Sequence, residues 1–344
     1  MTALVAMSGG VDSAVAASLL REAGHECVGV TLIMTDGMYA EAEMAKKTCD
    51  ALGMAHRTVD ARARFRDTVI ADFISQYEKG GTPNPCVLCN KRVKLGMLFE
   101  QMHALGCDRV ATGHYARIER DEGGRPLLLR AADETKDQSY MLWRLSQEEL
   151  SLLLLPLGDK HKAGIRAYAR EKGLPVHDRP DSQDICFIPD GDYAAFIERE
   201  TGKKFPCGDF CTEDGRVLGT HRGIIRYTVG QRKGLGLALS APLYVKEKHV
   251  STNTVVLTEE KNLYTDTVRA DSVNLIDGVT HETGEPFSVS AKVRYAHRAE
   301  RALAFLEEDG TLAVRFDAPV RAVAKGQSLV LYDGDRLLGG GIIL

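Results

Sequence analysis

The chain opens with a short apolar strand that leads directly into a glycine-containing turn and then a helix. Residues 4–6 are apolar, the turn spans residues 7–13 with two glycines, and an Ala- and Leu-rich segment follows from Ala14 to Glu22. The start of a helix presents unpaired backbone N–H groups and the positive end of the helix dipole. Glycine lets the backbone approach a ligand where a Cβ atom would clash. The sequence therefore predicts an anion site here, most plausibly for phosphate.

The residues of this turn exclude two common phosphate loops. The turn has neither Gly-x-x-x-x-Gly-Lys-Ser/Thr nor Gly-x-Gly-x-x-Gly, and it lacks the lysine that would reach a γ-phosphate. Its central residues, 8–13, read Ser-Gly-Gly-Val-Asp-Ser and resemble the pyrophosphatase loop (PP-loop) of the ATP-pyrophosphatase superfamily. Members of that superfamily transfer AMP to an oxygen atom and release pyrophosphate. The resemblance implies ATP and Mg²⁺ as cofactors.

Composition indicates a globular protein. Hydrophobic residues make up 44% and charged residues 27% of the 344 residues, and the chain has no apolar run of about 18 residues. We therefore expect no membrane span, and the lack of a signal-like segment at the start favours the cytoplasm. At a net charge of −4, binding of nucleic acid requires a local basic face.

Strand-like and helix-like segments alternate along the first part of the chain, and this alternation predicts a doubly wound parallel sheet of the α/β class. Ligands of such sheets bind beyond the carboxyl ends of the strands. Helices are expected to continue to about residue 200. The expected strands are 27–33, 56–59 and 109–112, and the expected helices are 40–52, a segment ending near Tyr77, and 93–105.

Short strand-like runs separated by glycine-containing turns replace this pattern from about Thr201. Asp309-Gly310 and Asp333-Gly334 are hairpin signals. We expect two small β domains here, the last of them barrel-like. The three expected domains are 1–200, an adenine nucleotide alpha hydrolase-like domain implied by the PP-loop, then 201–266 and 267–344.

Cysteines form a second informative pattern. Cys86 and Cys89 follow Asn84-Pro85 and precede a segment rich in Lys and Arg, and Cys186 lies about a hundred residues further on. A thiol at a helix N-terminus beside cations has a lowered pKa and is a better nucleophile or metal ligand, which is the prediction for Cys89. The cysteines in apolar segments are expected to be buried small hydrophobic residues. These are Cys27, Cys49 and Cys107.

Taken together, the motifs resemble the bacterial tRNA-specific 2-thiouridylase family from end to end. The motifs that carry this resemblance are the PP-loop, 84–90, 112–117, 136–140, 182–187 and 227–236. The resemblance implies an ATP-dependent sulfurtransferase that adenylates the oxygen at carbon 2 of the wobble uridine and then replaces it with sulfur. It implies tRNA and a sulfur-donor protein, a persulfide carrier or cysteine desulfurase, as partners.

The resemblance also assigns roles to individual residues. Cys186 carries sulfur as a persulfide, Cys89 is its catalytic partner and forms a disulfide with it, and Asp12 is catalytic. The implied nucleotide-binding residues are Ala6, Met7, Ser8, Gly9, Gly10, Val11, Asp12, Ser13, Leu32 and Gly113. The implied tRNA-binding residues are His114, Lys136, Asp137, Gln138, Arg294, Tyr295 and Gln327. A basic loop expected to follow a phosphate backbone contains Arg222, Arg226, Gln231, Arg232 and Lys233.

Cys86 departs from the family pattern, since members often carry Asp at this position. The departure leaves two alternatives to the persulfide–disulfide route. In one, Cys86, Cys89 and Cys186 hold a 4Fe–4S cluster with one open iron. In the other, Cys86 and Cys89 join Cys207 and Cys211 in a structural zinc site.

Two other functions remain open at this stage. One is a different PP-loop adenylating ligase or synthetase that acts on a small molecule, which would need no paired thiols. The other is a non-catalytic ATP- and RNA-binding redox protein.

Overall fold

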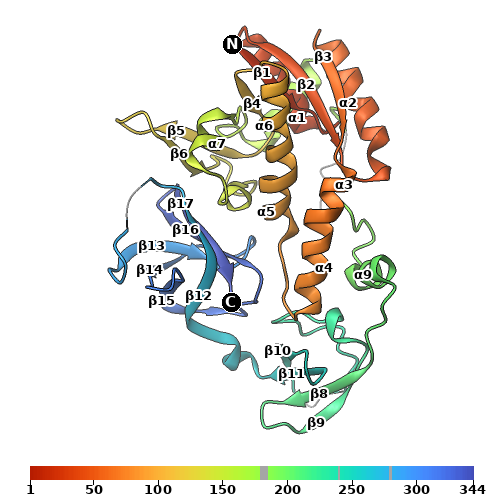
Figure 1. Ribbon diagram of the computed structural model, residues 1–344, viewed down its shortest axis with the longest axis vertical. Coiled ribbons are helices and arrows are strands. Elements are labelled where there is room, and N and C mark those ends of the chain that lie inside the picture. The colour runs from red at the N-terminus through yellow and green to blue at the C-terminus, as the bar shows by residue number, and fades with distance from the viewer. Residues whose placement is uncertain (179–184, 239–240, 279–280) are drawn as a thin grey trace.

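The computed structural model describes residues 1–178, 185–238, 241–278 and 281–344. Figure 1 shows three lobes: a mixed helix–sheet domain that contains the N-terminus, a small β domain at the opposite end, and a barrel that carries the C-terminus at the side. No helix of the described ranges is both long and apolar enough to cross a bilayer.

The first domain is built on a five-stranded parallel sheet in the order β3-β2-β1-β4-β7. All of its pairings are parallel, which confirms the predicted α/β class. The chain starts in the middle of this sheet, so β1 has neighbours on both sides. The strands are β1 (Thr2–Ala6), β2 (Glu26–Ile33), β3 (Ala55–Asp60), β4 (Arg109–Ala111) and β7 (Leu153–Leu154).

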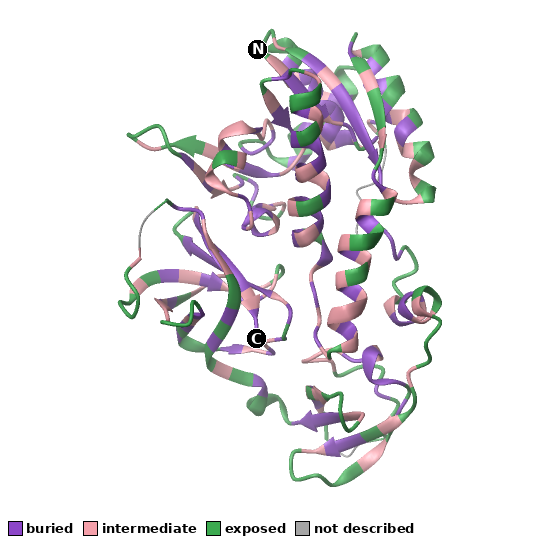
Figure 2. Ribbon diagram, in the orientation of Figure 1, coloured by how far each residue is buried: buried purple, intermediate pink, exposed green. Residues whose placement is uncertain are grey.

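Helices cover both faces of this sheet because its central strand β1 is apolar on both sides. Along β1, Leu4 packs with α6, whereas Ala3 and Val5 pack with α1 and α2. Figure 2 shows β1 and β2 largely as buried residues, whereas the edge strand β3 has none. A fourth helix packs beside α1. The helices are α1 (Val11–Glu22), α2 (Tyr39–Ala51), α6 (Leu95–Ala104) and α8 (Lys162–Glu171).

Two long helical segments lead from the sheet toward the small β domain (Figure 1). Each contains a π turn, and the two segments are joined at residues 79–84. In the structure, α5 packs against η2 of the first segment. The first segment is α3 (Arg62–Phe65), η2 (Arg66–Ile70) and α4 (Ala71–Glu78), and the second is α5 (Pro85–Cys89), η3 (Asn90–Lys94) and α6.

The expectation of helices only from 113 to 200 is wrong in one segment. Strands β5 (Ala116–Arg120) and β6 (Pro126–Arg130) form an antiparallel hairpin there, turning at Gly123-Gly124. The hairpin joins the edge of the C-terminal sheet through Leu129 and Arg336. Its apolar positions are buried against that sheet and a neighbouring helix, a tertiary pairing that the local sequence does not reveal. The shorter helices beyond it are η4 (Ser139–Leu142), α7 (Gln147–Leu152) and α9 (Tyr193–Thr201).

The two β domains are confirmed. The small domain is a four-stranded sheet in the order β10-β11-β8-β9, and the last domain is a six-stranded barrel closed by pairing of β12 with β17. Both Asp-Gly pairs lie in turns between successive antiparallel strands, as expected. The small sheet contains β8 (Gly208–Thr212), β9 (Val217–His221), β10 (Tyr244–His249) and β11 (Thr254–Thr258). The barrel contains β12 (Tyr264–Leu275), β13 (Phe287–Lys292), β14 (Glu300–Leu306), β15 (Leu312–Arg321), β16 (Ser328–Asp333) and β17 (Arg336–Ile343).

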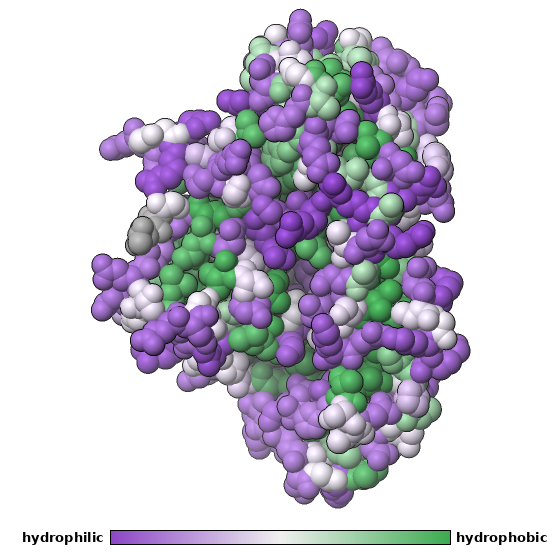
Figure 3. Space-filling model, viewed as in Figure 1, coloured by the Kyte–Doolittle hydropathy of each residue, from purple (hydrophilic) through white to green (hydrophobic). Residues whose placement is uncertain are grey.

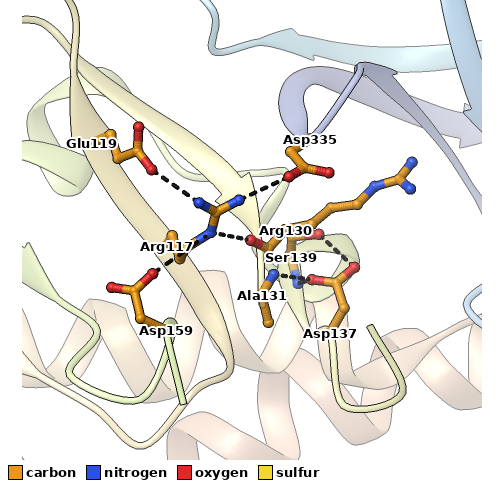
Figure 4. Close-up of polar contacts among 8 residues, drawn as sticks. All are labelled: Arg117, Glu119, Arg130, Ala131, Asp137, Ser139, Asp159 and Asp335. Atoms are coloured by element: carbon orange, nitrogen blue, oxygen red, sulfur yellow. Dashed lines mark hydrogen bonds and ion pairs between the residues drawn. The ribbon is translucent and has the colours of Figure 1, made fainter. Parts of the chain in front are cut away.

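The barrel packs tightly against the first domain. The Trp143 indole is fully buried and donates a hydrogen bond to Ser328 Oγ at 3.0 Å, and the Tyr140 hydroxyl donates to the Ser328 carbonyl at 2.9 Å. In Figure 4 the Arg117 guanidinium bridges the hairpin to the β16–β17 turn, donating to the Arg130 carbonyl and to Asp335. Polar bonds as well as apolar packing therefore fix the orientation of the barrel.

Replacing Trp143 with Phe is expected to weaken this junction. The substitution keeps an aromatic ring but leaves the buried Ser328 hydroxyl without its donor, which costs about 1–3 kcal/mol. Urea denaturation followed by circular dichroism should show a lower midpoint. Since both residues serve one bond, Trp143→Phe combined with Ser328→Ala should cost less than the two single changes added together; strict additivity would contradict this account.

Candidate functional site

A cavity of about 490 Å³ lies at the carboxyl edge of the parallel sheet. It is lined by the ends of β1, β2 and β4, by the first turn of α1, and by residues of the barrel and of the helical segment. Figure 3 shows a recess near the centre of this face, between the first domain and the barrel. Of the predicted nucleotide residues, the cavity is lined by Ala6, Met7, Ser8, Gly10, Val11, Asp12, Ser13, Leu32 and Gly113.

The turn between β1 and α1 is held open by its own hydroxyl groups. Ser13 Oγ donates to the Gly10 carbonyl at 3.0 Å, and the Ser8 N–H donates to Ser13 Oγ at 3.2 Å. Helix α1 begins at Val11 with no side-chain cap on its first N–H groups. These N–H groups and the positive end of the helix dipole are therefore available to an anion in the cavity.

Two glycines bring neighbouring backbone segments into close contact. Gly9 has φ +73°, and a Cβ atom there would lie 2.4 Å from the Glu41 carbonyl oxygen. A Cβ atom on Gly113 would lie 2.9 Å from backbone atoms of Asp12 and Ser13. Gly9 therefore allows the turn to pack against the backbone of Glu41 and does not line the cavity. Gly113 allows the loop after β4 to pack against the start of α1.

Asp12 contributes a carboxylate to the cavity lining, and two side chains hold it. Lys162 Nζ donates to both Asp12 oxygens at 2.7 Å, and the Tyr115 hydroxyl donates to Oδ1 at 2.7 Å. Lys162 itself is fixed by a bond from its backbone N–H to Asp133 at 3.0 Å. This pairing orients the carboxylate toward the cavity, where one carboxylate beside bound phosphates is a common arrangement for Mg²⁺.

The thiols lie beside the cavity but differ in exposure. Cys89 is buried and its thiol contacts Met34 Sδ at 3.9 Å, whereas Cys86 and Cys186 are exposed. Electrostatic interactions link Cys89 to both other thiols and to the Lys94 ammonium. The structure thus brings together the two thiols that sequence reasoning paired. Residues 182–184 of the third-cysteine motif lie outside the described residues.

The predicted low pKa of Cys89 is wrong. Burial raises the pKa of Cys89 to about 12, although the Lys94 ammonium acts in the opposite direction. The helix begins at Pro85, capped by Asn84, whose side chain accepts the Cys86 N–H at 3.1 Å. Cys89 therefore sits one turn inside a helical segment rather than at its start, so the helix terminus does not favour its thiolate. The expected burial of Cys27, Cys49 and Cys107 is confirmed.

Two ionisable groups on the cavity wall have shifted pKa values. Burial and the nearby Lys94 ammonium lower the pKa of His114 to about 3, so its imidazole is neutral, and His114 Nδ1 lies 2.8 Å from Thr112 Oγ1. Burial acts to lower the pKa of Lys94, but the three neighbouring thiols outweigh it and the net shift is upward. The wall therefore carries a neutral imidazole and the Lys94 amine.

The residues predicted to meet tRNA fall into two groups. His114, Lys136, Gln138 and Tyr295 line the cavity. The others make internal contacts that support that wall. The Asp137 carboxylate accepts from the backbone of Ala131 and Ser139, Arg294 donates to the Arg321 and Ala322 carbonyls, and Gln327 donates to the Thr82 carbonyl at 2.7 Å.

The predicted basic loop is split in a similar way. Arg222, Arg232 and Lys233 are exposed. Arg226 instead forms ion pairs with Asp192 and Glu198, and the Gln231 side chain bonds within its own turn. Arg226 therefore ties α9 to the small β domain.

The thiols do not form a metal-ligand set. Within the ranges that the structure describes, no group of three His, Cys, Asp or Glu side chains is placed to hold a metal ion. Cys207 and Cys211 lie in the small β domain, at and next to β8, so the zinc alternative finds no support. The described residues therefore do not fit a 4Fe–4S cluster in this conformation.

Sequence reasoning missed several residues of the cavity. Tyr115 and Thr112 belong to the motif at 112–117. The hydrogen bonds of their hydroxyl groups, to Asp12 and His114, depend on the fold. Lys162 begins α8, far along the chain, and Lys94 was noted only as part of a cationic segment. Neither lysine has a local sequence signal that places it at this site.

Cys86 and Cys89 are expected to react with iodoacetamide at different rates. At pH 8 a thiol of pKa about 12 is on the order of one part in ten thousand thiolate, and Cys89 is also shielded. Mass spectrometry of native protein should therefore show Cys86 alkylated at least about tenfold faster than Cys89, with exposed Cys207 as the reference. The Cys89 rate should rise steadily from pH 8 to 10. Preferential labelling of Cys89 would contradict the buried geometry.

Three family models match successive parts of the chain. The tRNA methyl transferase HUP domain matches residues 1–190, the tRNA methyl transferase PRC-barrel domain matches 194–259, and the aminomethyltransferase beta-barrel domain matches 265–343. These matches follow the three lobes of the structure.

Proteins similar to the chain over its whole length are called tRNA-specific 2-thiouridylases. The chain is 42% identical over 352 residues to the tRNA-specific 2-thiouridylase MnmA of Clostridioides difficile, covering 99% of this chain and 97% of that protein. It is 44% identical over 354 residues to a tRNA-specific 2-thiouridylase of Caldanaerobacter subterraneus, covering 99% and 97%. It is 44% identical over 348 residues to that of Pelobacter propionicus, covering 100% and 97%. By this similarity along its whole length, the chain belongs to the tRNA-specific 2-thiouridylase family.

Proposed function

We propose that this chain uses ATP to adenylate the wobble uridine of tRNA at the oxygen of carbon 2 and then replaces that oxygen with sulfur. The observation that carries the proposal is the position of the thiols. Cys89 and Cys186 lie close to each other, beside a cavity whose floor is an uncapped helix start. One site can therefore hold a nucleotide and a sulfur nucleophile together.

In this proposal the phosphates lie on the first turn of α1. The N–H groups there would bind phosphate oxygens, and the adenine would lie against the apolar wall formed by Val30, Leu32 and Met34. The residues fit ATP because Gly113 and the turn leave room where side chains would fill the space. Mg²⁺ would be held by the phosphates and Asp12, and when bound it would neutralise phosphate charge.

The sulfur chemistry would use the thiols in sequence. A persulfide on Cys186 attacks carbon 2 of the adenylated uridine, a carbon–sulfur bond forms, and AMP leaves with the electron pair of the carbon–oxygen bond. The Cys89 thiolate then attacks the Cys186 sulfur, which releases 2-thiouridine and forms a disulfide between the two cysteines. A thiol reductant reopens that disulfide. The exposure of Cys186 suits loading by a sulfur-donor protein in the cytoplasm.

The tRNA would enter from the side of the barrel. Tyr295 is exposed and lines the cavity, so its ring is available to stack on a uridine turned out of the anticodon. Lys292 lies 5.8 Å from the centre of that ring. Lys136, Gln138 and His114 form the adjacent wall, and the exposed arginines of the basic loop would contact the phosphate backbone.

Thiol substitution separates this function from its alternatives. With ATP and tRNA, the wild type should release pyrophosphate and form 2-thiouridine, detected by nucleoside mass spectrometry. Cys186→Ser should lower 2-thiouridine formation at least about 1000-fold and change pyrophosphate release by less than about threefold, because the nucleophile is absent from adenylation. The matched control is Cys207→Ser, an exposed thiol in the small β domain, which should keep both activities.

Other outcomes favour other functions. Thiol-independent turnover would indicate a PP-loop ligase acting on a small molecule. Bound ATP without any pyrophosphate release would indicate a non-catalytic ATP- and RNA-binding protein.

Gly113→Ala should impair nucleotide binding. A Cβ atom at this position would press on the backbone of Asp12 and Ser13 and so displace the first turn of α1. We expect the affinity for ATP, measured by isothermal titration calorimetry, to fall at least about tenfold, or about 1.4 kcal/mol. Gly164→Ala, within α8 and with no atom within 4 Å of the added Cβ, is the matched control and should keep the wild-type affinity. Equal affinities in all three proteins would refute this placement of ATP.

A further inference from the structure

Lys94 is a cation of the candidate site, and the adenylation and sulfur-transfer steps described for the other residues assign it no role. It ends the π turn η3, and its side chain lines the nucleotide cavity. The preceding turn, α5, carries Cys86 and Cys89. π turns are rare and occur frequently at functional sites, since the extra residue changes the direction of the side chains that follow. The turn therefore brings one lysine to both the thiols and the cavity.

The groups that interact electrostatically with the Lys94 ammonium are thiols. Cys89, Cys186 and Cys86 all interact with it, and the backbone N–H of Lys94 also bonds toward the Cys89 sulfur. Among the described residues, no carboxylate lies within ion-pair distance of Lys94. Lys162 on the opposite side of the cavity differs in this respect, because it is paired with Asp12.

Placing the Lys94 ammonium beside thiols and away from carboxylates costs free energy unless the charge has a role in the reaction. Lys94 is partly buried, which is unfavourable for a charge without a paired counter-charge, and burial raises the pKa of the Cys89 and Cys186 thiols, so both are mostly neutral at neutral pH. The position of Lys94 becomes favourable when a sulfur anion forms.

We propose that Lys94 stabilises the sulfur anion during its attack on the adenylated uridine, and that it acts in sulfur transfer rather than in adenylation. This inference rests on the proposed function. The carbon–sulfur bond forms and the carbon–oxygen bond to AMP breaks while Lys94 stays protonated throughout. It gives no proton to either group.

The first test compares the two half-reactions in three variants. Lys94→Met should lower single-turnover 2-thiouridine formation at least about 100-fold, since it removes a charge that is needed only at the attacking sulfur. Pyrophosphate release should change by less than about threefold, and Lys94→Arg should regain at least about tenfold of the lost thiolation. Arg92→Met, an exposed cation on the same π turn, is the matched control and should keep both activities.

The second test does not depend on the proposed function. In the free protein, Lys94→Met should slow alkylation of the exposed Cys186 by iodoacetamide about three- to tenfold, because the thiolate loses a cation that stabilises it. Lys94→Arg should restore the wild-type rate. Thermal melting followed by circular dichroism checks that the variants fold, and Lys94→Gln replaces Lys94→Met if that variant does not.

Three results would overturn the inference: equal losses of pyrophosphate release and thiolation, no recovery in Lys94→Arg, or an unchanged Cys186 alkylation rate in Lys94→Met. If the wild type forms neither product, the proposed function fails, and the alkylation rates still decide whether Lys94 stabilises the sulfur anion.

Discussion

The contact between Gly113 and the first turn of α1 is the constraint on which the candidate site depends. Strands β1 and β4 are neighbours in the sheet, so the loops that follow them leave the same edge. Only a residue without Cβ allows the second loop to lie against the backbone of Asp12 and Ser13. That approach puts the uncapped helix start, the Asp12 carboxylate and the His114 ring around one cavity. Parallel pairing of two strands thus sets the position of groups about a hundred residues apart.

The barrel completes the site from the other side. Tyr295 reaches the cavity, and its hydroxyl donates to the Asp137 carbonyl at 3.0 Å. The barrel also holds the segment before the first thiols, since the Thr82 N–H donates to the Lys325 carbonyl at 2.8 Å and Gln327 bonds the Thr82 carbonyl. The segment that leads to Cys86 is therefore fixed by a domain that begins far later in the chain. Movement of the barrel would move both the thiol-bearing helix and the Tyr295 ring.

The sequence predicted the parts of this fold that local patterns determine. The PP-loop, the parallel sheet and the Asp-Gly hairpins each follow from a few adjacent residues. The β5–β6 hairpin was missed because its partner strand, β17, lies about two hundred residues away. The Lys162–Asp12 pair and the internal bonds of Arg294 and Gln327 were missed for the same reason. They are tertiary contacts between residues far apart in the sequence, and no local sequence pattern links such residues.

Cys89 shows most clearly where local reasoning stops. A cysteine close to a helix start and followed by cations should have a reactive thiol, and that rule assumes exposure. Here the helix starts one turn earlier and the thiol packs against Met34, so desolvation outweighs the neighbouring ammonium. On the proposed function this burial has a use. The exposed Cys186 can accept sulfur from a donor, while Cys89 stays protonated and protected from oxidation until the sulfur–uridine intermediate is formed beside it. Differences in burial, more than position along a helix, then give two cysteines of one site separate roles.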